Sequence, residues 1–416
     1  MPGLPIDADR LQQQIDALAE ISEVPAPAVT RVIFSPQDMQ AREFLKRLIR
    51  EAGLDLREDG AGNIFARWNG SRPELPAIAS GSHTDAIPNA GRYDGVVGVL
   101  GVLEAIRALK QAGFTPKRSL ELIAFTSEEP TRFGVGCLGS RLMAGSLTLE
   151  KLHNLRDAHD RTFEELRTAA GYTANLDDVR LATGAYAGFI ELHIEQGPIL
   201  ESENTPIGIV ERIAAPSSLR VTVVGVGGHA GAVLMLERRD ALLAGAAIAL
   251  AVEAAVRASG RVDTVGTTGV FRIEPGAVNS IPHRAILEID LRDTDLTARD
   301  ETLERIREAI AEITRRRGVS AKVEIINADP PAQCETRLVQ CVEDVCIELG
   351  LRARRMVSRA YHDSLFMAQL CPITMIFIPC RDGVSHRPDE YSSPEQIRTG
   401  VEVLAHALQR LSADVD

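Results

Sequence analysis

The 416-residue sequence has little of several features that particular classes of protein need. Aromatic residues make up only 4%, so a surface for stacking bases or sugar rings is not indicated. The formal net charge is -12, which argues against a nucleic-acid partner, because nucleic-acid backbones are bound by basic faces. A small anionic substrate is not excluded, since metal ions and a single arginine can reverse the field inside a cleft.

Other absences concern the compartment. None of the six cysteines forms a Cys-x-x-Cys pair, which favours packed, reduced thiols over disulfides or a thiolate metal site. The first residues, MPGLPIDADRLQQQIDAL, lack the basic and then apolar segments of a secretory signal. The most apolar run, 241–252, is shorter than the ~20 residues of a membrane span. We therefore expect a cytoplasmic protein with no membrane partner.

The length and the element pattern predict two domains. Strand-like runs occur at 63–68, 77–82 and 120–126, with an apolar helix at 96–109 between the last two. A strand–helix–strand order is typical of an α/β fold with a mostly parallel sheet. The last ninety residues return to this alternation, with a buried strand at 373–378.

The middle of the chain has a different order. Six elements follow one another as β-α-β-β-α-β, a compact split βαβ unit that can form its own α+β domain; they are expected at 219–223, 239–258, 264–273, 285–292, 299–317 and 321–326. Proline-containing breaks stand at both ends of this unit. We therefore predict a catalytic domain from 1–214 and 329–416, with an inserted domain at 215–328.

The first motif that carries chemistry is GSHTD at 81–85. The apolar run before it places His83 at the carboxyl end of a strand, where open α/β sheets build their sites. Residues two apart on an extended chain face the same way, so Asp85 can hold the imidazole of His83 in one tautomer. Asp94 follows just ahead of a helix, where an ordinary N-cap is the alternative to a metal ligand.

A second motif, FTSEE, also ends a strand-like run and contains Glu128 and Glu129. Adjacent carboxylates are usually solvated surface charge. Here they follow an apolar strand, and two negative charges at a buried strand end are unfavourable unless cations neutralise them. Because consecutive residues project to different sides, one glutamate can bind metal while the other faces a substrate.

Two further histidines, His193 in ELHIEQGP and His386 in SHRP, complete a candidate ligand set. Each histidine alone is more often a satisfied buried group than a ligand. Together the set offers mixed nitrogen and oxygen ligands and a carboxylate that can bridge two ions; its members are His83, Asp94, Glu129, His193 and His386. Such ligands suit paired Zn²⁺ or Mn²⁺ rather than Ca²⁺ or a thiolate cluster.

These motifs resemble those of a known family over nearly the full length of the chain. The matching stretches are GSHTDAIPNAGRYDG, FTSEEPTRFG, ELHIEQGPILE, GGHAGAVLM, PGAVNSIPHRAILEIDLRD, YHDSLFM and SHRPDEY. The chain resembles the carbamoylase and allantoate amidohydrolase branch of the aminoacylase/carboxypeptidase-G-type two-metal hydrolases. The resemblance implies an aminopeptidase-like catalytic domain with two divalent metal ions and an inserted lid or dimerisation domain.

The resemblance also implies a role for each metal-site residue. One metal would be bound by His83, Asp94 and His193, and the other by Asp94, Glu129 and His386. Glu128 would be the general base that takes a proton from water, and Asp85 would orient His83.

Further residues would bind the substrate. Gln196 would contact it near the metals, His229 and Asn279 would come from the inserted domain, and Arg292 would bind its carboxylate. Taken alone, His229 reads as a loop histidine between glycines and Arg292 as a surface charge. The family's second domain commonly pairs two subunits, so we expect a homodimer in which His229 can act on the partner's site.

The substrate follows from two departures from the carbamoylase pattern. Around His362 and Asp363 the sequence has Arg359 and Tyr361 where carbamoylases carry glycines, and AVLM follows Gly231 in place of a Thr-Thr-Pro-Met-like run. Both departures resemble the ureidoglycolate amidohydrolase branch known from plants. The larger side chains should narrow the pocket and add donors, so Tyr361 and His362 are assigned to substrate binding.

The resulting hypothesis is hydrolysis of the ureido C–N bond of ureidoglycolate to glyoxylate, ammonia and carbon dioxide. Three alternatives with the same mechanism stay open: an N-carbamoyl-L-amino-acid hydrolase, an N-carbamoyl-β-alanine hydrolase and an allantoate amidohydrolase. A dipeptidase or aminoacylase fits less well, because HIEQGP replaces a more acidic motif. A catalytically dead ligand-binding relative is disfavoured, because the expected base and ligands are all present.

Overall fold

The computed structural model describes residues 3–414, which form two compact units. Unit 1 holds the described residues up to Glu211, then Gln333–Met356, and those from His362 onward. Unit 2 holds Arg212–Ala332 and Val357–Tyr361. The predicted boundaries after residues 214 and 328 differ from these divisions by three and four residues. The prediction left the segment Val357–Tyr361 in the catalytic domain, whereas its contacts group it with unit 2.

The strands of unit 1 form a two-stranded pair, β1 with β5, and a nine-stranded sheet of order β15-β8-β17-β7-β4-β6-β3-β2, with β16 paired to β8. Their bounds are β1 Val29–Arg31, β2 Asp55–Glu58, β3 Ile64–Trp68, β4 Ala77–His83, β5 Ala86–Ala90, β6 Leu120–Phe125, β7 Tyr186–Ile194, β8 Ile207–Ile213, β15 Ala332–Gln333, β16 Ala353–Ser358 and β17 Ile373–Ile378. The central strands β17, β7, β4 and β6 are parallel, and the pairs β8–β17, β3–β6 and β2–β3 are antiparallel. The expected α/β fold with a mostly parallel central sheet is confirmed.

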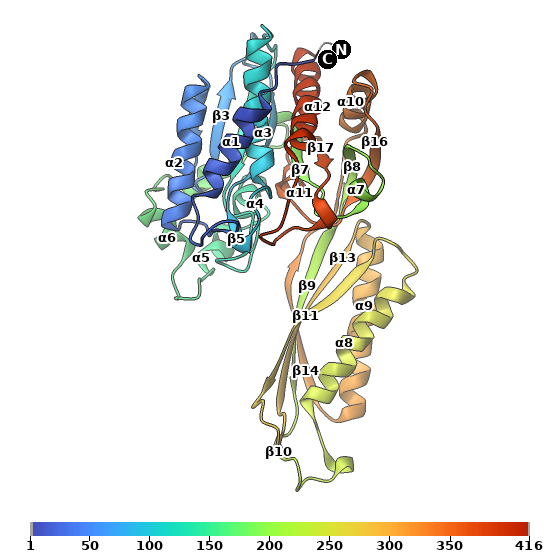
Figure 1. Cartoon of the computed structure of the whole chain (residues 1–416). Helices are drawn as coiled ribbons and strands as arrows, with labels where there is room; N and C mark the ends of the chain where they lie inside the picture. Colours follow the sequence, from blue (N-terminus) through green and yellow to red (C-terminus); the bar gives the residue numbers. More distant parts are fainter. Residues whose placement is uncertain (1–2, 415–416) are drawn as a thin grey trace. The chain divides into compact units, whose positions relative to one another are not determined.

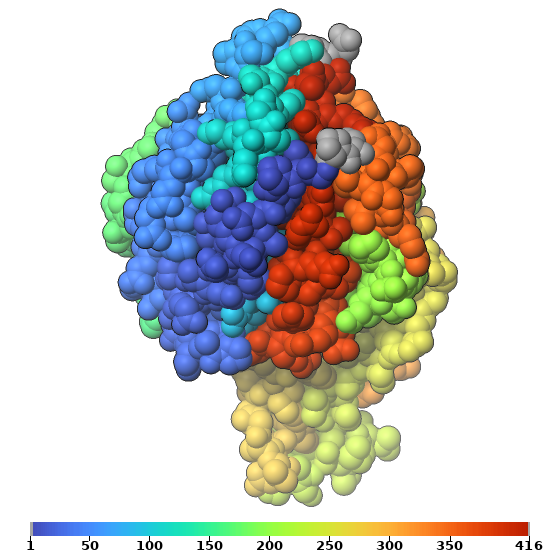
Figure 2. Space-filling model, turned by 45° about the horizontal axis from the view of Figure 1, so that its top comes forward, coloured from blue at the N-terminus to red at the C-terminus, as the bar shows by residue number. Residues whose placement is uncertain are grey.

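The helices of unit 1 pack on this sheet. Their bounds are α1 Ala8–Ala19, α2 Pro36–Glu51, α3 Val96–Gln111, α4 Leu138–Ala144, α5 Leu149–His153, α6 Phe163–Ala169, α7 Ile199–Ser202, α10 Thr336–Glu348, α11 Asp363–Met367 and α12 Pro394–Ala413, with 3₁₀ turns at Leu176–Val179 and Arg381–Gly383. The apolar helix α3 contacts β4, β6 and β7 and also packs against α12. Figure 2 shows the N-terminal segment (dark blue) and the C-terminal segment (red) side by side on unit 1, where α1 contacts α12.

Local sequence explains where several of these helices begin. α2 starts at a proline, whose fixed φ suits the first helical turn, and the Ser35 side chain accepts a hydrogen bond from the N–H of Asp38. α12 repeats this device with Ser393 and Pro394, and the Gln396 side chain completes a capping box.

Unit 2 contains an antiparallel sheet of order β11-β13-β9-β14 and a short pair, β10 with β12. Its elements are β9 Ala215–Val224, β10 Gly228–His229, α8 Ala241–Ala258, β11 Val265–Glu274, β12 Ser280–Ile281, β13 Arg284–Asp293, α9 Leu296–Arg317 and β14 Ser320–Ala328, with a 3₁₀ turn at Met235–Glu237. The principal order is the predicted β-α-β-β-α-β. Helices α8 and α9 lie along one face of the sheet (Figure 1).

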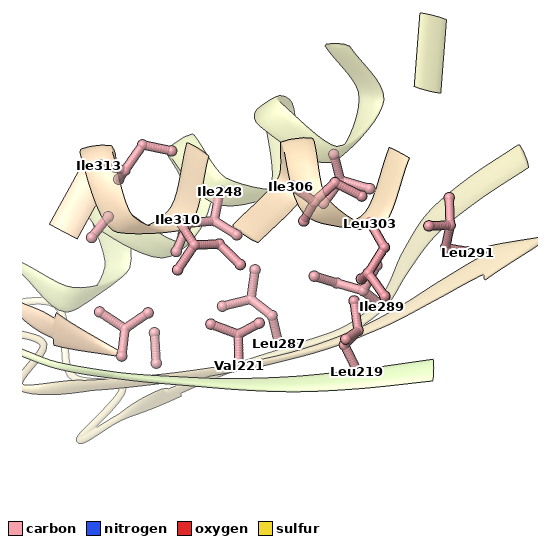
Figure 3. Packing of buried hydrophobic residues seen from close by; sticks show 14 of the residues in the cluster. Leu219, Val221, Ile248, Leu287, Ile289, Leu291, Leu303, Ile306, Ile310 and Ile313 are labelled. Carbon is pink, nitrogen blue, oxygen red and sulfur yellow. The ribbon is translucent and has the colours of Figure 1, made fainter. Parts of the chain in front are cut away.

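The core of unit 2 is apolar and fills the space between its helices and its sheet (Figure 3). Alternate residues of the strands point into it, such as Leu219 and Val221 of β9 and Leu287 of β13, and all three are fully buried. The helices contribute Ile248 and Ile306. This period-two burial is the pattern expected of a sheet covered on one face.

Helix α8 is longer than its most apolar run. It has 18 residues and, among residues 3–414, is long and apolar enough to cross a membrane by length and composition, whereas the run 241–252 is by itself shorter than the ~20 residues of a span. In the structure α8 packs Ala244, Ile248 and Val252 into the core of unit 2.

Candidate active site

The parallel strands of unit 1 end in chemistry-bearing residues at one edge of the sheet. His83 is the last residue of β4 and pairs with Phe125, the last residue of β6. Glu128 and Glu129 follow β6, and His193 lies one residue before the end of β7. Because the carboxyl ends of parallel neighbours meet at the same edge, the fold brings these side chains together.

Asp94 lies at the centre of this group, between two sets of nitrogen and oxygen atoms. Its Oδ1 is 3.0 Å from His193 Nε2 and 3.5 Å from His83 Nε2. Its Oδ2 is 3.2 Å from His386 Nε2, which in turn is 3.4 Å from Glu129 Oε1. Each carboxylate oxygen of Asp94 therefore faces a separate cluster of ligand atoms.

The two clusters fit divalent metal ions. In each cluster, His83–Asp94–His193 and Asp94–Glu129–His386, the ligand atoms lie within 4.8 Å of one another. Neighbouring ligands around a tetrahedral ion with bonds of about 2.0–2.1 Å lie ~3.3 Å apart, close to the separations that involve Asp94. The donors are imidazole nitrogens and carboxylate oxygens without a thiol, a set typical of zinc or manganese.

The electrostatics of the group differ from residue to residue. Burial alone would raise the pKa of Asp94, but hydrogen bonds from His193, His386 and His83 hold it well below its usual value. The hydrogen bond to Asp94 raises the pKa of His386 to about 9. Burial, together with the charge of Asp94, raises the pKa of Glu129 to about 7. Asp94 is thus the permanent anion around which the other groups are arranged.

Gly95 allows this close packing. Its φ is +65°, a conformation that L side chains rarely adopt, and a Cβ at this position would lie 2.5 Å from the ring of His83. The glycine after Asp94 therefore lets α3 begin directly beneath the imidazole.

Asp85 is close to His83, but not through the group that the sequence suggested. His83 Nδ1 lies 3.0 Å from the backbone oxygen of Asp85, and 3.7 Å from its carboxylate. The carboxylate accepts the N–H groups of Glu128 and Glu129 at 3.3 and 3.1 Å. Since β4 ends at His83, the side-chain alternation of a strand does not extend to Asp85. Its backbone oxygen orients His83, and its side chain holds the loop that carries the glutamates.

Glu128 points toward the metal clusters but is not a member of either. Its Oε2 lies 3.7 Å from His83 Nε2, and its Oε1 accepts a weak hydrogen bond from the thiol of Cys137 at 3.5 Å. Burial raises the pKa of Glu128 well above its usual value, and the negative charges of Glu129, Asp363 and Asp94 add to this effect. A buried carboxylate with a raised pKa is suited to accepting a proton.

Gln196 is placed beside the metal clusters by an unusual backbone conformation, with φ at +55°. Its amide donates hydrogen bonds to Asp94 Oδ2 at 2.8 Å and to Ser385 Oγ at 3.0 Å. In the structure the amide therefore binds the carboxylate of Asp94, and the expected contact of Gln196 with the substrate stays a prediction.

Two buried glutamates that the sequence reasoning missed support the site. Glu390 accepts the N–H groups of Tyr93 and Asp94 and the hydroxyl of Ser385, and so ties the loop of Asp94 to the loop of His386. Burial, with the charge of Asp94, raises the pKa of Glu390 to about 7. The signal was available: Glu390 lies in the SHRPDEY motif.

Glu191 is the second missed residue. It lies two residues before His193 on β7 and is fully buried. It accepts hydrogen bonds from Ser82 beside His83 and from Ser364 beside Asp363. A glutamate inside an apolar strand was the available signal. His362 lies nearby, with its ring 4.4 Å from that of His193, and Glu191, His193 and His362 form a third, buried group of possible ligands.

The remaining predicted substrate residues belong to unit 2 and lie in two places. His229 pairs with Ser280 on the β10–β12 ladder, next to Asn279, at one end of the sheet (Figure 1). Arg292 lies near the other end of β13, with its guanidinium 5.9 Å from the ring of Tyr361. Ser280, which pairs with His229, precedes Arg284, the first residue of β13, by only four positions. From Arg284 to Arg292 the strand advances eight residues, or roughly 27 Å. Within one chain, unit 2 therefore does not bring His229 and Asn279 together with Arg292.

The guanidinium of Arg359 lies against a carboxylate of unit 2. Its Nη2 is 2.8 Å from Asp263 Oδ1, so the side chain is held in an ion pair on unit 2. The expectation that Arg359 adds a donor for the substrate stays a prediction.

Comparison with known proteins agrees with this geometry. The model of peptidase family M20/M25/M40 matches residues 79–410. The chain is 54% identical to a ureidoglycolate hydrolase of Oryza sativa subsp. japonica over 98% of its own length and 85% of the relative's. It is 36% identical to an N-carbamoyl-L-amino-acid amidohydrolase of Pseudomonas sp. (strain NS671), covering 98% of this chain and 99% of that one.

The fold matches solved structures equally well. The crystal structure of AtUAH in complex with (S)-hydroxyglycine superimposes with a TM-score of 0.91 at 51% identity, over 99% of both chains. The aminopeptidase PepT of Bacillus cereus ATCC 10987 shares the fold at 15% identity, with a TM-score of 0.68 over 98% of this chain and 99% of that one. The expected resemblance to the two-metal hydrolases is confirmed, and the chain is a hydrolase that belongs to the metal-dependent peptidase family M20/M25/M40.

Proposed function

We propose that this hydrolase cleaves the ureido C–N bond of ureidoglycolate. The observation that carries the proposal is the gap in similarity: 54% identity to a ureidoglycolate hydrolase against 36% to an N-carbamoyl-L-amino-acid amidohydrolase, both over nearly the whole chain. Hydrolysis would release ammonia and a carbamate, whose loss of carbon dioxide leaves hydroxyglycine. Hydroxyglycine breaks down to ammonia and glyoxylate. Two of these compounds, (S)-hydroxyglycine and glyoxylate, are the ones bound in the AtUAH crystal structures.

The proposed cofactor is a pair of divalent cations, Mn²⁺ or Zn²⁺, that share Asp94. His83 and His193 would complete one site, and Glu129 and His386 the other. When bound, such a pair polarises the ureido carbonyl and lowers the pKa of water. The sharing of Asp94 is supported by its two oxygens, each of which faces one cluster.

The chain's own groups would move the proton. Glu128 would take a proton from the attacking water and pass it to the leaving ammonia, a task that suits its raised pKa. Asp85 would keep Glu128 in place, because its carboxylate accepts the N–H of Glu128. Arg292 and Tyr361 of unit 2 would bind the substrate carboxylate, and His362 would line the site.

We further propose that the protein is a homodimer through unit 2 and that His229 and Asn279 act on the partner's substrate. Within one chain, His229 and Asn279 lie toward the Arg284 end of β13, and Arg284 is roughly 27 Å along the strand from Arg292, a distance that a substrate as small as ureidoglycolate cannot span. Unit 2 also exposes large apolar side chains, including Leu250 of α8 at 68% and Phe271 of β11 at 40%. Such exposed apolar side chains are available to an association surface on unit 2.

A substrate panel tests the proposed activity. The purified enzyme, loaded separately with Mn²⁺ and with Zn²⁺, is assayed on ureidoglycolate, allantoate, N-carbamoyl-β-alanine and N-carbamoyl-L-amino acids. We expect the highest kcat/KM on ureidoglycolate. A clear preference for N-carbamoyl-L-amino acids would favour the second candidate, which the relatives of that name at 36–37% identity support.

A further inference from the structure

The segment Val357–Tyr361 is fastened to unit 2 by specific contacts. The N–H of Ala214 donates to the carbonyl of Ser358 at 2.8 Å, and the Ser358 hydroxyl donates to the carbonyl of Ala360 at 2.6 Å. The guanidinium of Arg359 then forms its ion pair with Asp263 at 2.8 Å. These contacts hold the backbone of Val357–Tyr361 in place and hold the charged side chain of Arg359 against Asp263.

The other side of this ion pair is itself held rigidly. Asp263 lies in a short loop whose neighbours, Arg261 and Thr264, both bond to Asp293. The carboxylate of Asp293 is fully buried and directly follows Arg292 on β13. The loop is therefore anchored at the residue next to Arg292.

The guanidinium of Arg292 is held by the backbone of Arg359 and by the carboxylate of Asp290. Its Nη1 donates to the carbonyl of Arg359 at 3.0 Å, while its Nε and Nη2 donate to Asp290 at 2.7 and 3.2 Å. Within residues 3–414 these contacts use three of the five N–H groups of the guanidinium and leave one on each terminal nitrogen. Two N–H groups are the number that a carboxylate needs for two hydrogen bonds.

We propose that the Asp263–Arg359 ion pair is a positioning device that fixes Arg292 for the substrate carboxylate. This inference rests on the proposed role of Arg292. Asp263 holds Arg359, the carbonyl of Arg359 accepts from Arg292, and Tyr361 follows two residues later beside the same guanidinium. The arginine that distinguishes this sequence from the carbamoylases thus acts through a neighbour and does not touch the substrate.

The exposure of the pair decides which measurement is informative. The side chains of Arg359 and Asp263 are 40% and 26% exposed, and ion pairs of this kind contribute little to folding. Loss of the pair should therefore leave the fold intact but allow the side chain of Arg292 to adopt several conformations in the free enzyme. The binding step should then carry the cost of ordering that side chain again.

The experiment measures kcat and KM of Asp263→Asn, alone and in an Arg292→Ala background, on the carboxylate substrate that the wild type hydrolyses fastest. We expect KM to rise about three- to tenfold in the single variant, with kcat within about twofold. In the Arg292→Ala background the same change should leave KM within about 1.5-fold, because the pair acts only through that side chain. Should Asp263→Asn fail to fold, Arg359→Gln breaks the same pair and keeps the backbone carbonyl.

The matched control is Glu288→Gln, which removes an ion pair with Arg220 of the same 2.8 Å length on the same sheet. It should leave KM unchanged. An unchanged KM in Asp263→Asn, or the same rise with and without Arg292, would overturn the positioning role. Failure of the proposed function would show instead in the wild type, as the absence of activity on ureidoglycolate in the substrate panel.

Discussion

Units 1 and 2 both have an apolar core, but unit 1 buries many more charged side chains than unit 2. Unit 1 buries charge: Arg31 is 1% exposed and donates to backbone carbonyls of Leu18 and Thr84, and Asp38 pairs with the buried Arg42. Unit 2 buries an apolar layer between its helices and its sheet (Figure 3), with few buried charges, Asp293 and Arg299 among them. Buried charges need a fixed arrangement of partners, whereas an apolar layer tolerates change. The difference fits the proposed division, in which the chemistry belongs to unit 1 and substrate binding and association belong to unit 2.

The largest effect should come from the shared carboxylate of unit 1. Asp94→Ala removes one ligand from each metal cluster, so we expect kcat/KM to fall by about four orders of magnitude or more. Elemental analysis of the purified variant should find less than one divalent ion per chain. The control His386→Ala removes a ligand of one cluster only and should retain about one ion. Two retained ions in Asp94→Ala would show that Asp94 does not bridge them.

The next largest effect separates proton transfer from metal binding within unit 1. Glu128→Gln keeps the shape of the side chain but cannot accept a proton, so kcat should fall by about 10²–10⁴ while the metal content stays at the wild-type level. Steady-state kinetics and elemental analysis on the same sample check both halves. A kcat within a few fold of the wild type would assign the base elsewhere.

A smaller effect is expected at Arg292, through which unit 2 is proposed to bind the substrate. Arg292→Ala removes hydrogen bonds to a charged group, and the loss of one such bond costs about 1.5–3 kcal/mol, so KM should rise by at least roughly 10- to 100-fold with kcat much less affected. Metal content should not change. If kcat falls and KM does not, the role of Arg292 lies in the chemical step and the division between the units fails.

The affinity of unit 1 for metal ions should fall as the pH falls. In the metal-free protein the pKa of His386 is about 9, so at neutral pH its imidazole holds a proton that a metal ion must displace. Affinity should fall by about tenfold per pH unit from pH 9 toward 7, and more steeply below 7, where Glu129 with a pKa of about 7 also takes up a proton. Isothermal titration with Mn²⁺ across this range checks the slope, and an affinity that does not vary with pH would contradict it.

The smallest effect on chemistry should follow from damage to the core of unit 2. Ile248→Ala deletes fully buried apolar volume and should destabilise unit 2 by about 2–5 kcal/mol. The metal content of unit 1 should remain unchanged below the unfolding transition of unit 2. Calorimetry with and without metal tests this independence, and loss of metal at the same temperature as unit 2 unfolds would refute it.

The sequence predicts the parts that depend on regular periodicity. The alternation of Leu219, Val221 and Val223 gives the buried face of β9, and the apolar runs of unit 1 give β4, which ends at His83, and β6, which Glu129 follows four residues later. Parallel strands necessarily align their carboxyl ends, so the meeting of these residues could be expected before any coordinates.

The sequence fails where the backbone leaves a regular element or where contacts join distant segments. Asp85 lies past the end of β4, so its carboxylate turns to the glutamate loop and its carbonyl faces His83. The positive φ of Gln196 aims its amide at Asp94. The hydrogen bond that the N–H of Asp94 donates to Glu390 joins residues 296 positions apart, and no local sequence pattern predicts such a pairing.

The central claim is that one carboxylate, Asp94, joins two divalent ions in unit 1. Electron paramagnetic resonance of the protein titrated with Mn²⁺ tests it most directly, because two ions that share a carboxylate are magnetically coupled. The account predicts a coupled signal that saturates at two ions per chain together with full activity. Full activity at one ion per chain, with the six-line spectrum of isolated Mn²⁺, would contradict it.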